Sequence, residues 1–240
     1  MKHIGILAHS FEGATLCFHT ACMEGVAKLG AHMHPEITMT CQPMALVLDA
    51  WERGDNAELR GFFLKDAGKL AAAGADFFVL PDNTAHIAME SDGEPFPIPG
   101  LHIGEIVAEK AARDGRRKVG ILGTKYTMNG PVYSGALGRR GIDWAVPSAE
   151  DQKTINSIIF DELCLGVFTD EARAAYVAII EKLKAGGCDA VALVCTEIPL
   201  LVTPEISPLP TLDSTRLLAK AAVEVAVGER PMPEWRGGPV

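Results

Sequence analysis

Two short polar segments carry residue types that could move protons, and each comes after an apolar run. Cys195 directly follows the run at residues 190–194, and Asp82 comes shortly after the run at residues 77–80. Apolar runs without polar alternation are typical of strands buried on both faces of a parallel sheet. Ligands of such sheets bind beyond the carboxyl ends of the strands. The thiol and the carboxylate are therefore candidates for acid–base chemistry.

The surroundings of these two segments repeat along the chain. Residues 119–123 (Val-Gly-Ile-Leu-Gly) echo residues 4–8 (Ile-Gly-Ile-Leu-Ala), and the Gly-x-Asp motif at 187–189 echoes the one at 74–76 with nearly the same offset. Two matched anchors at one offset indicate a duplicated structural unit. The sequence therefore predicts two similar lobes whose strand ends face each other, with the carboxylate and the thiol on opposite sides of one cleft.

The predicted fold class is α/β, with two similar Rossmann-like or flavodoxin-like lobes, parallel sheets, a pseudo-dyad and an active site in the cleft. Helical patterns alternate with the strand-like runs, as at residues 56–73, where apolar residues recur on one face. We expect an N-terminal lobe at residues 1–100, joined by a C-terminal helix at 212–228, and a C-terminal lobe at 101–211. The tail at 229–240 holds three prolines and is expected to be mobile.

Further hydroxyl and amide side chains follow the predicted strands and would hold a substrate carboxylate. These substrate-binding candidates are Ser10, Asn83, Thr84, Thr124, Thr127 and Thr196. A carbon next to a carboxylate is a very weak acid, so hydrogen-bond donors must stabilise the charge that builds up when its proton leaves. The catalytic candidates are Cys195 and Asp82, because two proton-transfer groups on opposite faces of one ligand suit stereochemical change at carbon.

Two more polar residues are supporting candidates. His86 follows Asp82 by one helical turn and is expected to be a hydrogen-bond partner at a helix start. Glu197 is expected to cap the following segment, to orient Cys195, or to lie in solvent.

Composition and charge exclude several classes of function. The 240-residue chain has a net charge of −9 and no basic block, so nucleic acid and anionic membranes are not expected partners. A cytoplasmic location is expected, because the sequence shows neither a signal-like start nor an apolar run that could span a bilayer. The six cysteines form no Cys-x-x-Cys pair, and no GxGxxG motif follows the first strand. Neither a metal nor an organic cofactor is expected.

Two motifs resemble the signatures of the aspartate/glutamate racemase superfamily, which acts without pyridoxal phosphate. They are Pro-x-Asn-Thr-Ala-His at residues 81–86 and Cys-Thr-Glu-Ile-Pro-Leu-Leu at residues 195–201. The similarity extends to Gly-Thr-x-x-Thr-Met at 123–128 and Ile-Ile-Phe-Asp-Glu-Leu at 158–163. The superfamily also includes hydantoin racemases, maleate isomerases and arylmalonate decarboxylases. The resemblance implies a cofactor-independent amino-acid racemase or epimerase that takes a small carboxylate or amino-acid substrate and forms homodimers or higher oligomers.

The chain departs from the family pattern at Asp82, where the relatives have a cysteine. Of the two family thiols only Cys195 is carried over, and Asp82 is expected to act as a base on the opposite face. Reference pKa values of a carboxyl and a thiol differ by about 4.6 units, or roughly 6 kcal/mol, so racemisation is expected to be slow or unequal between enantiomers. Leu165 precedes Gly166 where relatives often have a lysine, which disfavours an acidic amino-acid substrate.

Two other functions fit the same residues. A single cysteine can protonate one face of an enolate formed by another bond-breaking step, as in a lyase or isomerase resembling arylmalonate decarboxylase or maleate isomerase. A catalytically impaired carboxylate-binding protein would keep the threonine-rich cradle and lose one base. Exchange of the α-hydrogen in deuterated water, release of carbon dioxide, and binding without exchange would separate the three functions.

Overall fold

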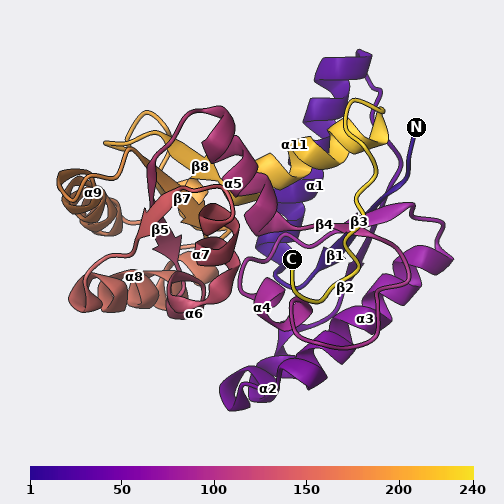
Figure 1. Cartoon of the computed structure of the whole chain (residues 1–240), viewed down its shortest axis with the longest axis horizontal. Helices are drawn as coiled ribbons and strands as arrows, with labels where there is room; N and C mark the ends of the chain where they lie inside the picture. Colours follow the sequence, from indigo (N-terminus) through magenta and orange to yellow (C-terminus); the bar gives the residue numbers. More distant parts are fainter. The chain divides into compact units, whose positions relative to one another are not determined.

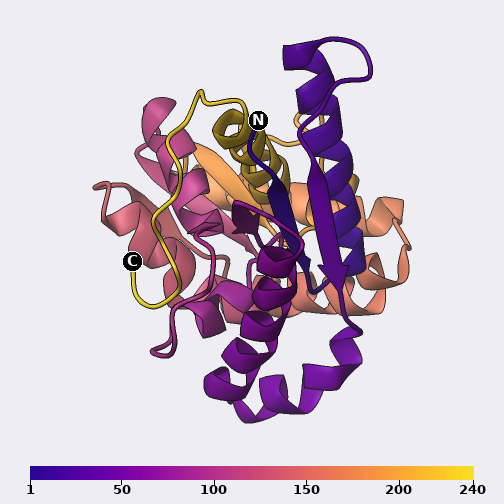
Figure 2. The same ribbon diagram turned by 90° about the vertical axis from the view of Figure 1, so that its right-hand side faces the viewer.

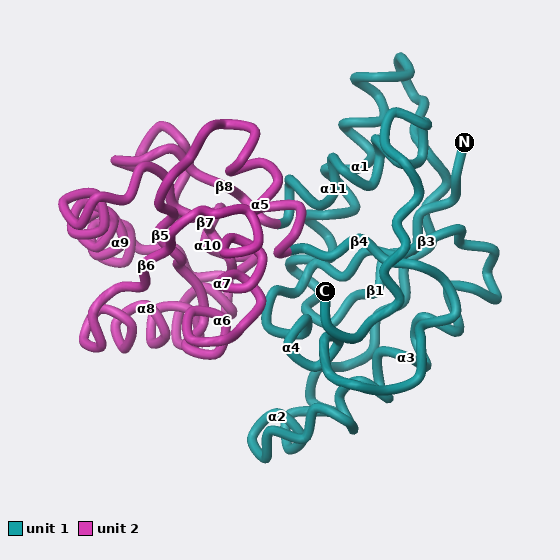
Figure 3. Tube along the Cα trace, viewed as in Figure 1, with its two compact units in different colours: residues 1–103, 215–240 teal, residues 104–214 magenta.

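The computed structural model describes all 240 residues and divides them into two compact units (Figure 3). Unit 1 comprises Met1–Ile103 and Thr215–Val240, and unit 2 comprises Gly104–Ser214. Unit 1 is therefore discontinuous in sequence, whereas unit 2 is one continuous segment. Figure 1 labels most helices and strands of both units, and β6 and α10 are labelled in Figure 3.

Unit 1 is built on a four-stranded parallel sheet in the order β2-β1-β3-β4. Its strands are β1 (Ile4–Ala8), β2 (Ile37–Cys41), β3 (Phe77–Val79) and β4 (Gly100–Leu101), and its helices are α1 (Phe11–Leu29), η1 (Met44–Val47), α2 (Leu48–Arg53), α3 (Asn56–Ala72), α4 (Ala85–Met89) and α11 (Ser214–Ala226), which starts at the unit boundary. Every residue of β1 and β3 is buried. Leu7, Phe63 and Phe78 belong to one apolar core that joins these two strands to α3.

Unit 2 repeats this topology with a four-stranded parallel sheet in the order β6-β5-β7-β8. Its strands are β5 (Lys118–Gly123), β6 (Asp143–Ala145), β7 (Ala190–Val194) and β8 (Thr211–Asp213), and its helices are α5 (Ile103–Arg113), α6 (Lys125–Asn129), α7 (Pro131–Gly138), α8 (Ala149–Asp161), η2 (Leu163–Leu165), α9 (Asp170–Ala185) and α10 (Ile198–Leu201). In both sheets the second strand of the unit is an edge strand and pairs with the first. The first strand also pairs with the third, and the third pairs with the fourth, which forms the other edge. The predicted α/β class, with two similar parallel-sheet lobes, is confirmed.

The C-terminal tail is packed against the rest of unit 1. This differs from the mobile tail that the sequence predicts. Figure 2 shows it as an extended yellow segment without helix or strand. The backbone N–H of Gly100 donates to the Trp235 carbonyl at 2.8 Å, and that of Phe96 donates to the Arg236 carbonyl at 2.9 Å. The Trp235 ring packs against Phe78, with ring centroids 6.4 Å apart. An aromatic anchor and backbone pairing thus offset the entropy that a proline-containing tail loses on ordering.

Candidate active site

Unit 1 brings a histidine and a carboxylate together where two neighbouring strands end. β1 and β3 are paired in parallel, with Ile6 opposite Val79, so the segments that follow them leave the same edge of the sheet. His9 Nδ1 lies 2.6 Å from Asp82 Oδ2. The other carboxylate oxygen, Oδ1, accepts a hydrogen bond from the Ala85 N–H at 3.0 Å, where α4 begins. Both oxygens of Asp82 are therefore held in place.

The electrostatics of this pair keep the carboxylate charged. Burial by itself would raise the pKa of Asp82, but the hydrogen bond and charge of His9 and the N–H of Ala85 outweigh burial and hold that pKa below its ordinary value. Asp82 is therefore ionised at neutral pH, and His9 must carry a proton on Nδ1 to donate across the 2.6 Å contact. The Asp82 side chain keeps 14% of its surface exposed and His9 keeps 4%, so the carboxylate is the accessible member.

His86 supports the backbone of Asp82. Its Nδ1–H donates to the Asp82 carbonyl at 2.8 Å, and its Nε2 accepts from the Ile103 N–H at 3.3 Å. Burial, together with nearby His102, lowers the pKa of His86 to about 3, so the ring is neutral. Because both ring nitrogens bind backbone groups, the supporting role of His86 is to fix the loop that carries Asp82.

Unit 2 brings a thiol and a carboxylate together at the corresponding edge. β5 and β7 pair with Gly123 opposite Val194, so Thr124 and Cys195 directly follow paired residues. A Cβ on Gly123 would lie 2.8 Å from the Val194 carbonyl oxygen, so only glycine allows this close approach of the two strands. The Cys195 thiol donates to Glu197 Oε2 at 3.0 Å.

The surroundings of Cys195 favour the protonated thiol. Burial, the charge of Glu197 and the hydrogen bond to Glu197 raise the pKa of Cys195 well above its ordinary value. Of the three roles considered for Glu197, the structure supports the orientation of Cys195. The same burial and the charges of Cys195 and Glu197 raise the pKa of Tyr176, a fully buried phenol on α9 whose hydroxyl has no hydrogen-bond partner. The Cys195 thiol is thus protonated in its resting form.

Three of the six predicted carboxylate-binding residues lie at the starts of helices. The Ser10 hydroxyl accepts from the Gly13 N–H at 3.4 Å and caps α1. The Thr124 hydroxyl accepts from the Thr127 N–H at 3.2 Å and caps α6, and the Thr124 and Thr127 hydroxyls lie 3.1 Å apart. Capping satisfies N–H groups that a helix start leaves without partners. These hydroxyls therefore shape the strand exits in addition to any contact with a ligand.

The other three predicted residues lie beside the two candidate catalytic groups in the sequence. Asn83 and Thr84 lie between Asp82 and the first residue of α4, with Asn83 buried and Thr84 half-buried. Thr196 is buried directly after Cys195. Each unit thus gathers its own set of polar side chains around one ionisable pair.

Comparison with known proteins assigns the chain to a family. A family model described as Asp/Glu/Hydantoin racemase matches residues 9–222. The chain belongs to this family. The broad specificity amino-acid racemase RacX of Bacillus subtilis (strain 168) is 26% identical over 169 residues, which are 70% of this chain and 73% of RacX.

Solved structures of similar proteins share the fold of this racemase-family chain. A candidate Asp/Glu racemase from Yersinia pestis superposes with a TM-score of 0.84 at 30% identity, covering 95% of this chain and 100% of the other. An aspartate racemase homologue from Pyrococcus horikoshii OT3 superposes with a TM-score of 0.78 at 26% identity, with the same two coverages. Within this racemase-family fold, Asp82 and Cys195 follow the third strand of their respective units.

His9 is the residue that the sequence analysis did not single out. A lone histidine in the loop after the first strand has no distinctive spacing. The available signal was positional: His9 directly follows β1 as Asp82 follows β3, and neighbouring parallel strands end at one edge. Recognising it required the strand order, which the sequence repeat alone does not determine.

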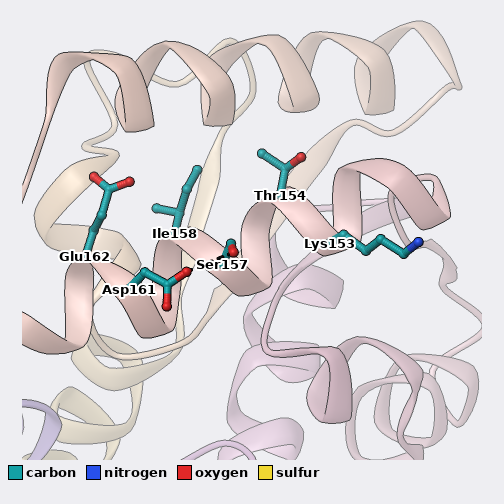
Figure 4. A pocket seen from close by; sticks show the side chains of 6 residues that line it. All are labelled: Lys153, Thr154, Ser157, Ile158, Asp161 and Glu162. Atoms are coloured by element: carbon teal, nitrogen blue, oxygen red, sulfur yellow. Dashed lines mark hydrogen bonds between the residues drawn. The ribbon is translucent and has the colours of Figure 1, made fainter.

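The surface of unit 2 also has a hollow whose lining includes neither of these pairs. A hollow of about 500 Å³ is lined by Lys153, Thr154, Ser157, Ile158, Asp161 and Glu162 along one face of α8 and its end (Figure 4). Ser157 donates to Asp161 there at 2.9 Å, and none of the predicted site residues lines this hollow.

No group of three or more His, Cys, Asp or Glu side chains is arranged to hold a metal ion. No helix has the length and apolar character needed to cross a membrane.

Proposed function

We propose that the protein is a cofactor-independent amino-acid racemase or epimerase. In this proposal Asp82 and Cys195 exchange the α-proton on opposite faces of a small amino-acid substrate. The supporting observation is that each unit places an ionisable pair, His9–Asp82 or Cys195–Glu197, after equivalent strands of the same topology. Membership of the Asp/Glu/Hydantoin racemase family supports the reaction type.

The resting protonation states suit one direction of the reaction. The ionised Asp82 carboxylate takes the α-proton, and the electron pair of the broken C–H bond moves into the substrate carboxylate. The protonated Cys195 thiol then delivers its proton to the opposite face of the carbon. Hydroxyl and amide groups of Ser10, Asn83, Thr84, Thr124, Thr127 and Thr196 stabilise the negative charge of the enolate-like state.

The reverse direction needs the opposite protonation states. Asp82 must then be protonated and Cys195 must be a thiolate, which the carboxylate of Glu197 disfavours at 3.0 Å. The two enantiomers are therefore expected to react at unequal rates. Replacing Asp82 by cysteine would match the proton affinities of the two groups and is expected to raise the rate of racemisation.

Deuterium exchange tests the proposal. Enantiopure amino acids with acidic, polar and apolar side chains are incubated in deuterated water without added cofactor, and α-deuteration is followed by NMR with chiral chromatography of the products. Exchange coupled to inversion is expected, and it should be lost in Cys195→Ala and Asp82→Asn. Parent rates in both variants would refute the proposed roles.

A single-thiol lyase is the second candidate, because the resting Cys195 thiol is protonated and a single thiol can protonate one face of an enolate. The same samples are therefore incubated with arylmalonates. Release of carbon dioxide that depends on Cys195, without α-exchange of any amino acid, would favour the lyase. Tight binding of carboxylates with neither reaction would favour a binding protein.

A further inference from the structure

We propose that His9 is a positioning residue that acts through Asp82, fixing the carboxylate in the orientation in which it meets the substrate. This role rests on the proposed racemase function. The contact joins residues 73 positions apart, with Nδ1 and Oδ2 separated by 2.6 Å. His9 is more deeply buried than Asp82, which keeps the larger exposed fraction. The imidazole therefore contacts the carboxylate from its buried side and leaves the exposed side of the carboxylate open to a ligand.

A base that abstracts a proton from carbon needs a fixed position. Misplacement of a reacting group by about 1 Å can lower a rate by about 100-fold. Asp82 is fixed at two points, because the Ala85 N–H holds Oδ1 and His9 holds Oδ2. Removing His9 leaves one point, and the carboxylate can then rotate about its side-chain bonds.

The histidine is itself held by aromatic rings. The Phe63 ring meets it edge-on, with centroids 5.4 Å apart and an interplanar angle of 89°. Trp51 and Phe62 lie with ring centroids at 6.0 and 6.5 Å from the imidazole. These rings come from α2 and α3, so two helices of unit 1 set the orientation of the imidazole.

The second ring nitrogen of His9 argues against a role in packing alone. Nε2 is buried and has no hydrogen-bond partner. A buried polar atom without a partner costs about 1–3 kcal/mol, so an apolar residue would pack against these aromatic rings at lower cost. Violations of this kind are expected at functional sites. The hydrogen bond from His9 Nδ1 to Asp82 is the polar interaction that offsets the cost of burying Nε2.

Three substitutions at His9 separate positioning from packing. His9→Asn keeps an N–H near the position of Nδ1, His9→Gln moves the same amide one carbon further, and His9→Leu fills the space without a donor. We expect kcat to fall by about 100-fold or more in the glutamine and leucine variants, with KM changed by less than about threefold, and to recover by at least about tenfold in the asparagine variant. His3→Leu, at the other end of β1, serves as the matched control and should keep the parent kcat.

Equal losses in all three variants would show that the N–H donated to Asp82 is not what the ring contributes, and parent kcat in His9→Leu would show that filling the space is enough; either result would overturn the positioning role. Thermal midpoints of all the variants identify any that fail to fold. The asparagine and glutamine pair keeps the proposal refutable if the leucine variant does not fold.

Titration of the Asp82 carboxyl separates this proposal from the racemase function. The groups that act on its pKa are His9, His86 and the Ala85 N–H, and His86 is neutral. The carboxyl carbon is observed by ¹³C NMR in aspartate-labelled protein and assigned by its loss in Asp82→Asn. In His9→Leu it should titrate at higher pH than in the parent, because burial then acts with less opposition. An unmoved titration would overturn the contact, whereas a moved titration without α-exchange in the parent would overturn only the racemase function.

Discussion

Lowering the pH from 7 to 5 is expected to reduce the stability of unit 1 through His86. The ring is fully buried, and its pKa is about 3 in the folded protein against an ordinary value of 6.5. Because the folded value is the lower one, the contribution to stability is complete above pH 6.5 and is lost as the pH falls from 6.5 towards 3. The slope is about 1.4 kcal/mol per pH unit, so the loss between pH 7 and pH 5 is about 2 kcal/mol.

His86→Asn isolates this contribution. Asparagine can still donate to the Asp82 carbonyl but cannot gain a proton, and it leaves the Ile103 N–H without its acceptor. We expect the variant to be less stable than the parent at pH 7 by about 1–3 kcal/mol. Its further loss between pH 7 and pH 5 should be smaller than that of the parent by about 2 kcal/mol.

Urea unfolding followed by tryptophan fluorescence measures these differences. In a Trp144→Phe background the remaining tryptophans, Trp51 and Trp235, both belong to unit 1 and report its unfolding. His19→Asn, which removes an exposed histidine on α1, is the matched control and should keep the parent pH slope. An equal loss between pH 7 and pH 5 in the His86 variant and the parent would refute the conclusion that the ring is held neutral.

Three further changes have expected outcomes. Phe63→Ala should lower the free energy of unfolding by about 3–5 kcal/mol in urea titrations, because Phe63 is fully buried and fills the space between the core and His9. Deleting residues 229–240 should speed amide exchange at Phe96 and Gly100, whose N–H groups bond to the tail, and unchanged protection would contradict this. Tyr176→Phe should leave the free energy of unfolding unchanged or raise it by up to about 1 kcal/mol, because it removes a buried hydroxyl without a partner; a larger loss would show that the hydroxyl is bonded.

The sequence was informative where local pattern decides structure. Apolar runs without alternation predicted the strands before Asp82 and Cys195, and the repeated Gly-x-Asp motif predicted two units of one topology. The sequence predicts substrate-binding roles for the serine and threonine residues at strand exits. Ser10 and Thr124 proved to cap helices as well, because the same hydroxyl that could hold a carboxylate also satisfies a free backbone N–H.

Features that depend on distant parts of the chain could not be predicted. The pair of His9 and Asp82 requires β1 and β3 to be neighbours, and strand order follows from packing of the whole unit. The binding of the tail depends on Trp235 meeting Phe78, which lies far away in the sequence. The prolines led to the prediction of a mobile tail, but they carry no information about whether the tail packs against another part of unit 1.

The discontinuity of unit 1 has a consequence for the order of folding during synthesis. Unit 2 is complete once residue 214 has left the ribosome, whereas unit 1 still lacks α11, whose Leu218 and Val223 are fully buried in the finished protein. Domains usually fold in the order of their synthesis, from the N-terminus onward. Here residues 1–103 can complete their fold only after residues 215–240 have been synthesised. The nascent sheet that carries Asp82 is therefore expected to stay exposed to chaperones and proteases longer than the sheet that carries Cys195.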